Sequence, residues 1–380
     1  MYYGSLPTML RLSFHDIKRN GIEYNKMGAV YEHFFVLLKY FRCNAEDVTP
    51  LPEALPYGYE LPRLDSEASR QLVSSTLSPL TTYLLPFELK NKPNYFVLPL
   101  TFRTFARNFE TTMLRFICFG SGSSGNCYLL QTDTDALLID VGVGLRGLKK
   151  ACREYGINLA CVHHVLVTHD HADHIKSVGS FSKDYHCPVY ATSEVHKGIL
   201  RNYCVAQKVP SELVHILEKD TTISVGDFQV TPFAVPHDSS DNVGYFVEAS
   251  GTNFCLITDA GEVTDQMKGY IQRARHLVIE ANHDTEMVLS GPYPPFLKSR
   301  ILSGTGHLSN LSCAQAVVDN MSDFLEHIWL CHLSEENNHP ELARKTVETV
   351  LRSHGVIPGV DVQLEVLKRT VPTGPFDLSD

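Results

Sequence analysis

The sequence has no Cys-x-x-Cys pair and no hydrophobic run long enough to cross a membrane. Its 10 cysteines are spread along the chain, so neither a zinc knuckle nor a dithiol redox motif is indicated. The longest apolar stretch, residues 34–41, is interrupted by Lys39 and is far shorter than the ~20 residues of a membrane helix. No secretory signal pattern opens the sequence. We therefore expect a cytoplasmic protein without a membrane partner, whose reduced cysteines fill apolar positions.

Positive charge is also scarce. The 380 residues carry a formal net charge of -10, and all of that negative excess lies in residues 113–380, since residues 1–112 are near neutral. An acidic surface disfavours passive, charge-driven binding to duplex DNA or to anionic lipid. A phosphate substrate is still compatible with this charge, because bound divalent cations reverse the local field at a site. The composition is that of an ordinary globular protein, so specific residues have to indicate the function.

Residues 1–112 and residues 113–380 have different patterns. The front part has aromatic clusters, a proline-rich stretch at 50–62, one plausible helix at 29–41, and no series of strands joined by tight glycine turns. From Met113 onward, strand-like runs alternate with glycine-rich turns and helical patterns. We expect a domain at 113–380, preceded by an N-terminal extension at 1–112 of unknown structure. The extension is either lineage-specific and poorly ordered or an over-called start, with Met113 as the true initiator.

The pattern from Met113 predicts an α/β fold. Strands are expected at 114–119, 127–131, 136–141, 162–168, 189–191, 228–235, 243–248, 253–258, 276–280 and 327–331. Helices are expected at 145–155, 194–202, 264–274, 312–321 and 340–353. Because the strands arrive in two batches with helices between them, we predict two sheets packed face to face, with helices outside.

A cluster of histidine and aspartate follows the predicted strand at 162–168. His169 and His171 are close enough in sequence for their imidazoles to reach one ion, and Asp173 and His174 follow at the next turn. Four such groups just past a hydrophobic strand can serve two adjacent ions. A histidine-rich surface loop is the alternative, but a strand followed by Thr-His-x-His-x-Asp-His is too specific an arrangement to favour it.

Two metal ions require further ligands, which we expect at later strand ends. His237, Asp259 and His332 each follow a predicted strand, where sheet folds present functional groups on a rigid support. The alternatives are a buried or capping histidine for His237, a turn former for Asp259 and a core histidine for His332. Asp170, inside the first cluster, is either a partner for a ligand imidazole or a solvated acid.

This motif series resembles that of the metallo-β-lactamase superfamily: Thr-His-x-His-x-Asp-His, a later histidine, an aspartate after a strand and a final histidine. The resemblance covers residues 113–380 and implies the four-layer αββα sandwich of that superfamily. It also implies a ligand set for two ions: His169, His171 and His237 for one, Asp173, His174 and His332 for the other, and Asp259 as the bridge. In this pattern Asp173 also orients the attacking water.

A site of this kind has an expected mechanism. Two divalent ions lower the pKa of a shared water, so that a metal-bridging hydroxide is available as nucleophile at neutral pH. The same ions hold the anionic transition state. The imidazole-rich ligand set suits zinc, while the carboxylates leave room for manganese or iron. We therefore expect a metal-dependent hydrolase with two divalent metal ions, zinc or manganese, as its cofactors.

Further motifs narrow the resemblance to the YycJ/WalJ-like branch. They are Phe-Gly-Ser-Gly-Ser-Ser-Gly-Asn at 119–126, Glu-Ala-Asn-His-Asp at 280–284, Gly-His-Leu-Ser-Asn at 306–310 and His-Leu-Ser-Glu-Glu-Asn-Asn at 332–338. That branch implies a cytoplasmic phosphodiesterase, a 5′-end exonuclease on single-stranded DNA linked to mismatch repair. One alternative is a small-molecule hydrolase of thioesters, lactones or cyclic phosphodiesters with the same metals. Another is a non-catalytic binding module. The oligomeric state stays open.

Two histidines of these motifs are candidate catalytic residues. His283 and His307 can contact a phosphate or donate a proton to a leaving oxygen. The alternatives are a structural role for His283 and a helix start for His307. Asn310 is expected to cap the helix that begins near residue 311, and the Gly/Ser run at 120–125 is expected to form a tight turn rather than a phosphate cradle.

Signs of single-strand binding are confined to one stretch. A basic and aromatic patch is formed by Tyr293, Phe296, Lys298 and Arg300, residue types that stack on bases and attract phosphates. A solvated loop is an equal alternative for this stretch. An open basic groove leading to the metals would favour the nuclease, and a compact pocket under a lid would favour the small-molecule hydrolase.

Overall fold

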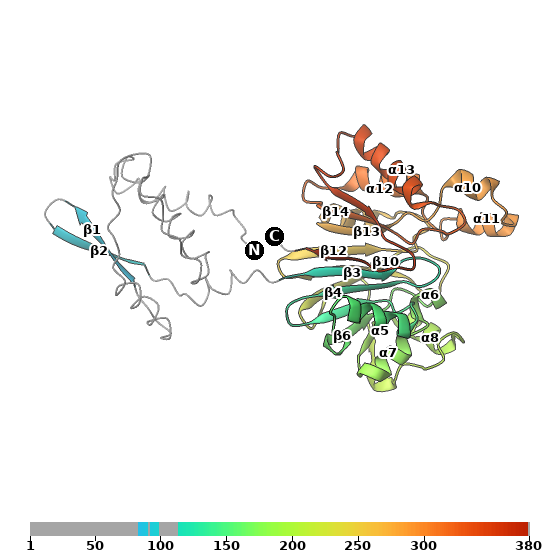
Figure 1. Ribbon diagram of the computed structural model, residues 1–380, viewed down its shortest axis with the longest axis horizontal. Coiled ribbons are helices and arrows are strands. Elements are labelled where there is room, and N and C mark those ends of the chain that lie inside the picture. Colours follow the sequence, from blue (N-terminus) through green and yellow to red (C-terminus); the bar gives the residue numbers. More distant parts are fainter. Residues whose placement is uncertain (1–82, 90–91, 99–112, 379–380) are drawn as a thin grey trace. The chain divides into compact units, whose positions relative to one another are not determined.

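The computed structural model describes residues 83–89, 92–98 and 113–378 (Figure 1). The chain divides into two compact units, residues 1–101 and 102–380. In the first unit, β1 (Tyr83–Leu89) pairs antiparallel with β2 (Lys92–Leu98). The sequence pattern did not indicate these strands, because Pro86 and Pro93 interrupt them and proline is depleted in strands. The helix expected at 29–41 lies outside the described residues.

One seven-stranded sheet combines the start of the second unit with its C-terminal strand. The strand order is β16 (Thr373–Asp377), β3 (Arg115–Gly120), β4 (Cys127–Gln131), β5 (Ala136–Ile139), β6 (Val162–Leu166), β7 (Val189–Ala191) and β8 (Val214–Ile216). Neighbours are antiparallel from β16 to β5 and parallel from β5 to β8. The carboxyl ends of β5 and β6 therefore lie at the same edge of the sheet.

The other seven-stranded sheet repeats this plan. Its order is β9 (Ile223–Val225), β10 (Phe228–Ala234), β11 (Val243–Ala249), β12 (Thr252–Ile257), β13 (His276–Glu280), β14 (His327–Cys331) and β15 (Gln363–Val366). Neighbours are antiparallel from β9 to β12 and parallel from β12 to β15. Residues that follow β12, β13 and β14 are thus brought to one edge, where α/β sheets commonly place their sites.

The two sheets pack face to face, and helices cover their outer faces (Figure 1). Between the sheets lies an apolar core that includes Phe116, Tyr128 and the single tryptophan, Trp329. The first sheet is covered by α5 (Leu145–Glu154), α7 (Val178–Tyr185) and α8 (Ser193–Arg201). The second is covered by α9 (Asp265–Arg273), α12 (Asn310–Asn320) and α13 (Pro340–Ser353). The expected αββα sandwich is confirmed.

Every strand and helix predicted for 113–380 is present, with ends shifted by a few residues. The sequence missed β8, β9, β15 and β16, and the helices α6 (Ala172–Ile175), α7, α10 (Thr285–Ser290) and α11 (Pro295–Ile301). Most of these are too short to show a hydrophobic period. The nine described cysteines are unpaired and mostly buried, as expected. No helix among the described residues has the length and apolarity that a bilayer crossing requires.

Candidate metal centre

The loop at 168–174 leaves the carboxyl end of β6 and is fixed by the neighbouring strand end. His171 lies directly before α6 as its N-cap residue, and the backbone N–H of Asn126 donates to the carbonyl of Asp173 at 2.7 Å. Gly142 packs so closely that a Cβ there would lie 1.5 Å from the same carbonyl oxygen. Only glycine fits at this position. The close contact of Gly142 with the loop therefore fixes where the histidines and the aspartate of the loop lie.

Three histidines form one group. One ring nitrogen of each of His169, His171 and His237 lies within 4.8 Å of the others. His237 comes from the loop after β10, and its Nε2 lies 3.3 Å from Nδ1 of His171. The ring centroid of the buried His169 lies 4.7 Å from that of His171 and 5.0 Å from that of His237. The three imidazoles are therefore close enough to share one ion.

Asp173, His174 and His332 form a second group, whose ligand atoms also lie within 4.8 Å of one another. His332 follows β14, and its Nε2 lies 3.4 Å from Oδ2 of Asp173. Nε2 of His174 lies 3.6 Å from the same oxygen. His174 is fully buried, whereas the Asp173 side chain is 22% exposed. This group can hold a second ion, with Asp173 on its solvent side.

Asp259 lies between the two groups. Its Oδ2 is 3.2 Å from Nε2 of His174, and its Oδ1 is 3.6 Å from Nε2 of His237. Asp259 and His332 both have a φ of 52°, a left-handed conformation that is costly for residues other than glycine and is often found at functional sites. The structure thus brings all seven residues of the predicted ligand set together.

The chemistry of the cluster fits divalent cations. Nε2 of His169 is buried and has no hydrogen-bond partner among the described residues. Asp140, Asp173, Asp259 and Glu280 lie around the imidazoles, and none of them pairs with a lysine or arginine of the described domain. Buried carboxylates need a compensating positive charge, and an unpartnered imidazole nitrogen is a ready ligand. Metal ions at this position satisfy both requirements.

The pKa values of the histidines differ between the two groups. Burial, helped by His174, holds the pKa of His169 well below its ordinary value, and burial also lowers the pKa of His237. Burial opposes charge on His332 as well, but Asp259 and other nearby carboxylates outweigh it and raise its pKa to about 10. His169 and His237 therefore offer neutral imidazoles, the form that binds metal. The second group of residues lies in a more negative electrostatic field, because carboxylates surround His332.

Two buried carboxylates that position ligands were missed from the sequence. Asp140, just after β5, accepts a hydrogen bond from Nδ1 of His174 at 2.6 Å. Glu280, at the end of β13, accepts from Nδ1 of His307 at 2.8 Å and from Nδ1 of His332 at 3.0 Å. Burial disfavours the charge of Glu280, but the facing histidines hold its pKa at about 2. Glu280 ends the predicted strand at 276–280, and Asp140 lies one residue before the end of the predicted strand at 136–141, so a search for acids at strand ends would have found both.

The two candidate catalytic histidines lie differently. The ring centroid of His307 is 5.1 Å from that of His237 and 5.4 Å from that of His332, and its side chain is 20% exposed. His283 is only 2% exposed, and its ring makes no hydrogen bond or ion pair with the seven among the described residues. Its backbone instead forms a β-bridge with Ser309. His307 therefore borders the cluster, whereas His283 is buried and has no such contact with it.

The predicted helix cap at Asn310 is wrong. Ser309 is the N-cap of α12, and its Oγ accepts a hydrogen bond from the N–H of Ser312 at 3.0 Å. Asn310 is the first helical residue and is buried, with its amide bonded to Oδ1 of Asn338 at 3.0 Å. A buried asparagine so engaged is unavailable for capping, and the serine just before it has the extended backbone that a cap needs.

Asp170 is half-buried, and within the described part of the chain its hydrogen bonds do not include a candidate ligand imidazole. Its carboxylate accepts hydrogen bonds from the backbone N–H of Ser240 at 3.0 Å and from the Ser240 hydroxyl at 2.6 Å. The backbone carbonyl of Asp170 accepts from the Asn202 amide at 2.9 Å. Asp170 therefore ties the 168–174 loop to the loop after His237 and to the end of α8.

The Gly/Ser run at 120–125 is the tight turn that was expected. The N–H of Ser121 donates to the carbonyl of Arg369 at 3.2 Å, and that of Gly122 donates to Oδ1 of Asn126 at 2.8 Å. The Ser121 hydroxyl accepts from the backbone N–H of His332 at 2.9 Å. With these groups already engaged within the chain, the turn supports His332 and is poorly suited to cradle a phosphate.

The predicted basic and aromatic patch lies mostly on a helix, and not on the solvated loop that was its alternative. Phe296, Lys298 and Arg300 lie on α11, and Phe296 is 74% exposed. Arg300 pairs with Asp238, with Nη2 of Arg300 3.0 Å from Oδ1, and Lys298 donates to the carbonyl of Leu289 at 2.6 Å. The pair with Asp238 connects α11 to the residue next to His237.

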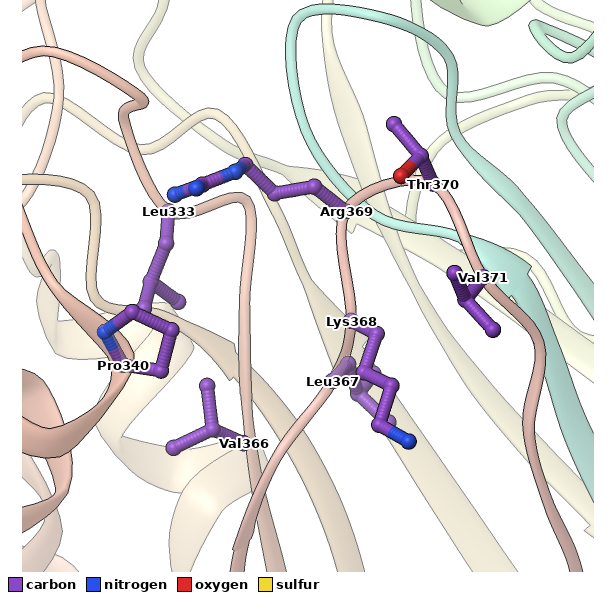
Figure 2. Close-up of a pocket in the computed structure, with 8 residues that line it drawn as sticks. All are labelled: Leu333, Pro340, Val366, Leu367, Lys368, Arg369, Thr370 and Val371. Atoms are coloured by element: carbon purple, nitrogen blue, oxygen red, sulfur yellow. The ribbon is translucent and has the colours of Figure 1, made fainter.

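None of the seven residues lines a surface hollow of about 240 Å³. Figure 2 shows the eight residues that line it: Leu333, Pro340, Val366, Leu367, Lys368, Arg369, Thr370 and Val371. None is a candidate ligand. His171 is 31% exposed in its side chain, so the cluster opens directly to the surface on the side of that residue.

Comparisons with known proteins agree with this geometry. The sequence model of the family described as "Beta-lactamase superfamily domain" matches residues 136–332. Exodeoxyribonuclease YycJ of Bacillus anthracis is 36% identical over 260 residues, 68% of this chain and 97% of that protein. Exodeoxyribonuclease WalJ of Streptococcus pneumoniae (strain D39) is 36% identical over 250 residues, 66% of this chain and 93% of that protein.

A solved structure shows the same fold. The metallo-beta-lactamase fold protein YhfI from Bacillus subtilis superposes with a TM-score of 0.51 at 17% identity, covering 70% of this chain and 99% of that one.

Proposed function

Because the chain belongs to the metallo-β-lactamase superfamily, in the branch of the YycJ and WalJ proteins, we propose that it is a metal-dependent 5′-end exonuclease on single-stranded DNA. One observation carries the proposal. Two groups of three candidate ligands lie on either side of Asp259 in a chain that matches two exodeoxyribonucleases over nearly their whole length. The proposal includes a cytoplasmic location and a role in DNA repair, as that branch implies.

The cofactors in this proposal are two divalent ions, zinc or manganese. His169, His171 and His237 would hold one ion, Asp173, His174 and His332 the other, and Asp259 would contact both. When bound, the ions supply an activated water and neutralise charge on the phosphate. The imidazole majority of this set favours zinc, and its carboxylates also suit manganese.

The protein's own groups orient the reactants. Oδ2 of Asp173 faces Nε2 of His332 at 3.4 Å, and the carboxylate is partly exposed, so Asp173 can accept a hydrogen bond from the attacking water. His307 donates through Nδ1 to Glu280, which leaves its Nε2 to transfer a proton to the leaving oxygen. His283 is too buried to meet substrate in this conformation, so we assign it to positioning the loop that carries His307.

Exposed aromatic side chains on both sides of the centre favour a single strand as the substrate. Tyr203 is 94% exposed and follows Asn202, whose amide holds the 168–174 loop through Asp170. Phe296 is 74% exposed on α11, which Arg300 ties to the loop next to His237. Figure 1 shows α8 and α11 on either side of α6. Unpaired bases stack on such side chains, whereas bases in a duplex are already stacked.

The second candidate function, a small-molecule hydrolase, uses the same metals. It would need a compact pocket over the centre, whereas His171 and Asp173 lie partly exposed at the surface. The nuclease is therefore the better supported function.

Labelled oligonucleotides test the proposal. The protein is incubated with Zn²⁺ or Mn²⁺ and with single-stranded or duplex DNA labelled at either end. We expect mononucleotides to be released from the 5′ end of the single strand and a much slower reaction on the duplex. Asp259→Asn should abolish cleavage, and His354→Gln, a change at an exposed histidine on the far end of α13, should not. Turnover of a thioester or cyclic phosphodiester without DNA cleavage under either metal would replace the nuclease by the second candidate.

A further inference from the structure

A second histidine pair lies at the opposite edge of the second sheet. His276 and His327 are the first residues of the parallel strands β13 and β14, and they are direct partners in the register. Their Nδ1 atoms lie 3.1 Å apart. His276 is fully buried, and His327 is half-buried. The candidate catalytic centre follows the carboxyl ends of the same strands, so this pair is a separate site.

A carboxylate completes the arrangement. Ligand atoms of His276, His327 and Glu326 all lie within 4.8 Å of one another. Glu326 Oε1 pairs with Nη2 of Arg275 at 2.6 Å, which leaves its other carboxylate oxygen available. The backbone of Glu326 is fixed on both sides, since its N–H donates to the carbonyl of Arg275 at 2.8 Å and its carbonyl accepts from Gln363 at 2.7 Å. The three donors are thus held by strand geometry.

The spacing suits a transition metal. With Zn–N bonds of about 2.0 Å and tetrahedral angles, two ligand nitrogens lie about 3.3 Å apart, close to the observed 3.1 Å. The His327 ring is stacked on Trp329, with centroids 4.9 Å apart and an angle of 5° between planes. A plain hydrogen bond between two imidazoles has the same nitrogen separation, so the nearby carboxylate is what distinguishes a metal site from such a pair.

We propose that His276, His327 and Glu326 bind one zinc ion, with solvent in its fourth position. Such an ion clips β13 to β14 and stabilises the domain, and its open position and the competing Arg275 make it exchangeable. The inference does not depend on the proposed nuclease activity, because it concerns metal content and stability at the other edge of the sheet.

Metal counting on the full chain tests the site. Wild type, Glu326→Gln, His327→Gln and the exposed-histidine control His354→Gln are equilibrated at a series of buffered free zinc concentrations, and zinc per chain is measured by mass spectrometry. We expect wild type and the control to bind one zinc ion per chain more than Glu326→Gln and His327→Gln bind. If the two site variants still bind this ion, we expect their affinity for it to be at least about tenfold weaker. Zinc should also raise the unfolding temperature less in the variants.

Each outcome decides the matter. Glu326 is 45% exposed in its side chain, so Glu326→Gln should fold even if His327→Gln does not. If wild type and Glu326→Gln have equal zinc content and equal zinc affinity, the proposal that Glu326 helps to bind a zinc ion is wrong. If wild type does not cleave DNA but still binds more zinc than the site variants, only the proposed function would be contradicted, and the zinc site would stand.

Discussion

Asp140 accepts a hydrogen bond from Nδ1 of His174 at 2.6 Å, with both side chains fully buried. This contact fixes the ring orientation of His174 and leaves its Nε2 facing Asp259 at 3.2 Å. A carboxylate behind a ligand imidazole sets its tautomer and increases its basicity. Asp140 therefore determines how well His174 can bind a metal without touching the metal itself.

We predict that Asp140→Asn weakens metal binding. Asparagine tolerates the left-handed backbone of Asp140, whose φ is 61°, so the change removes charge rather than shape. Loss of such a partner lowers metal affinity by about 10–100-fold, which a zinc titration by calorimetry measures. The matched control is Asp135→Asn. The Asp135 carboxylate likewise contacts two histidines, His163 at 2.8 Å and His164 at 3.1 Å, but neither of them belongs to the candidate metal centre. A folded Asp140→Asn with wild-type affinity would contradict this role.

Gly142→Ala should disrupt the loop of the candidate ligands. A Cβ at this position would lie 1.5 Å from the carbonyl oxygen of Asp173, so the loop must move away. We expect loss of metal binding together with a destabilisation of about 1–3 kcal/mol, typical of overpacking. Gly147→Ala is the control, because an added Cβ in helix α5 meets no atom within 4 Å and should stabilise by about 0.5–1 kcal/mol. Denaturant unfolding and zinc titration measure both effects, and wild-type metal binding by Gly142→Ala would refute this explanation.

The sequence predicted the seven candidate ligands because each follows a hydrophobic strand, and parallel strands bring their carboxyl ends to one edge. Asp140 and Glu280 also lie at strand ends, but neither belongs to the series of ligand motifs that identified the seven. The cap at Asn310 failed because burial against Asn338 depends on a segment far away in sequence. Likewise, nothing local to Asp170 indicates that its partner is Ser240. Ligand positions follow from strand order, whereas their supporting contacts depend on loop packing.

His307→Gln should slow the reaction at the leaving group. His307 is held by Glu280 at 2.8 Å, and removal of a general acid costs about 10²–10⁴-fold in kcat. A substrate whose leaving group needs no proton, such as the p-nitrophenyl ester of thymidine 5′-phosphate, should lose much less activity. Steady-state kinetics on both substrates, with zinc content measured in parallel, separate the two cases. Equal losses on both substrates would indicate that His307 acts through the metal ligands instead.

Phe296→Ala should weaken binding of a single strand without affecting the chemistry. Phe296 is 74% exposed and buries no core surface, so the change leaves the fold intact. Stacking of one base contributes about 1–3 kcal/mol, and its loss raises KM about fivefold or more while kcat is kept. Tyr203→Ala, at 94% exposure, should act in the same way. Phe324→Ala is the matched control, because Phe324 is 77% exposed but lies just before β14, at the far edge of the sheet. An equal KM change in all three variants would show that general surface apolarity, not stacking beside the metal centre, is what these residues supply.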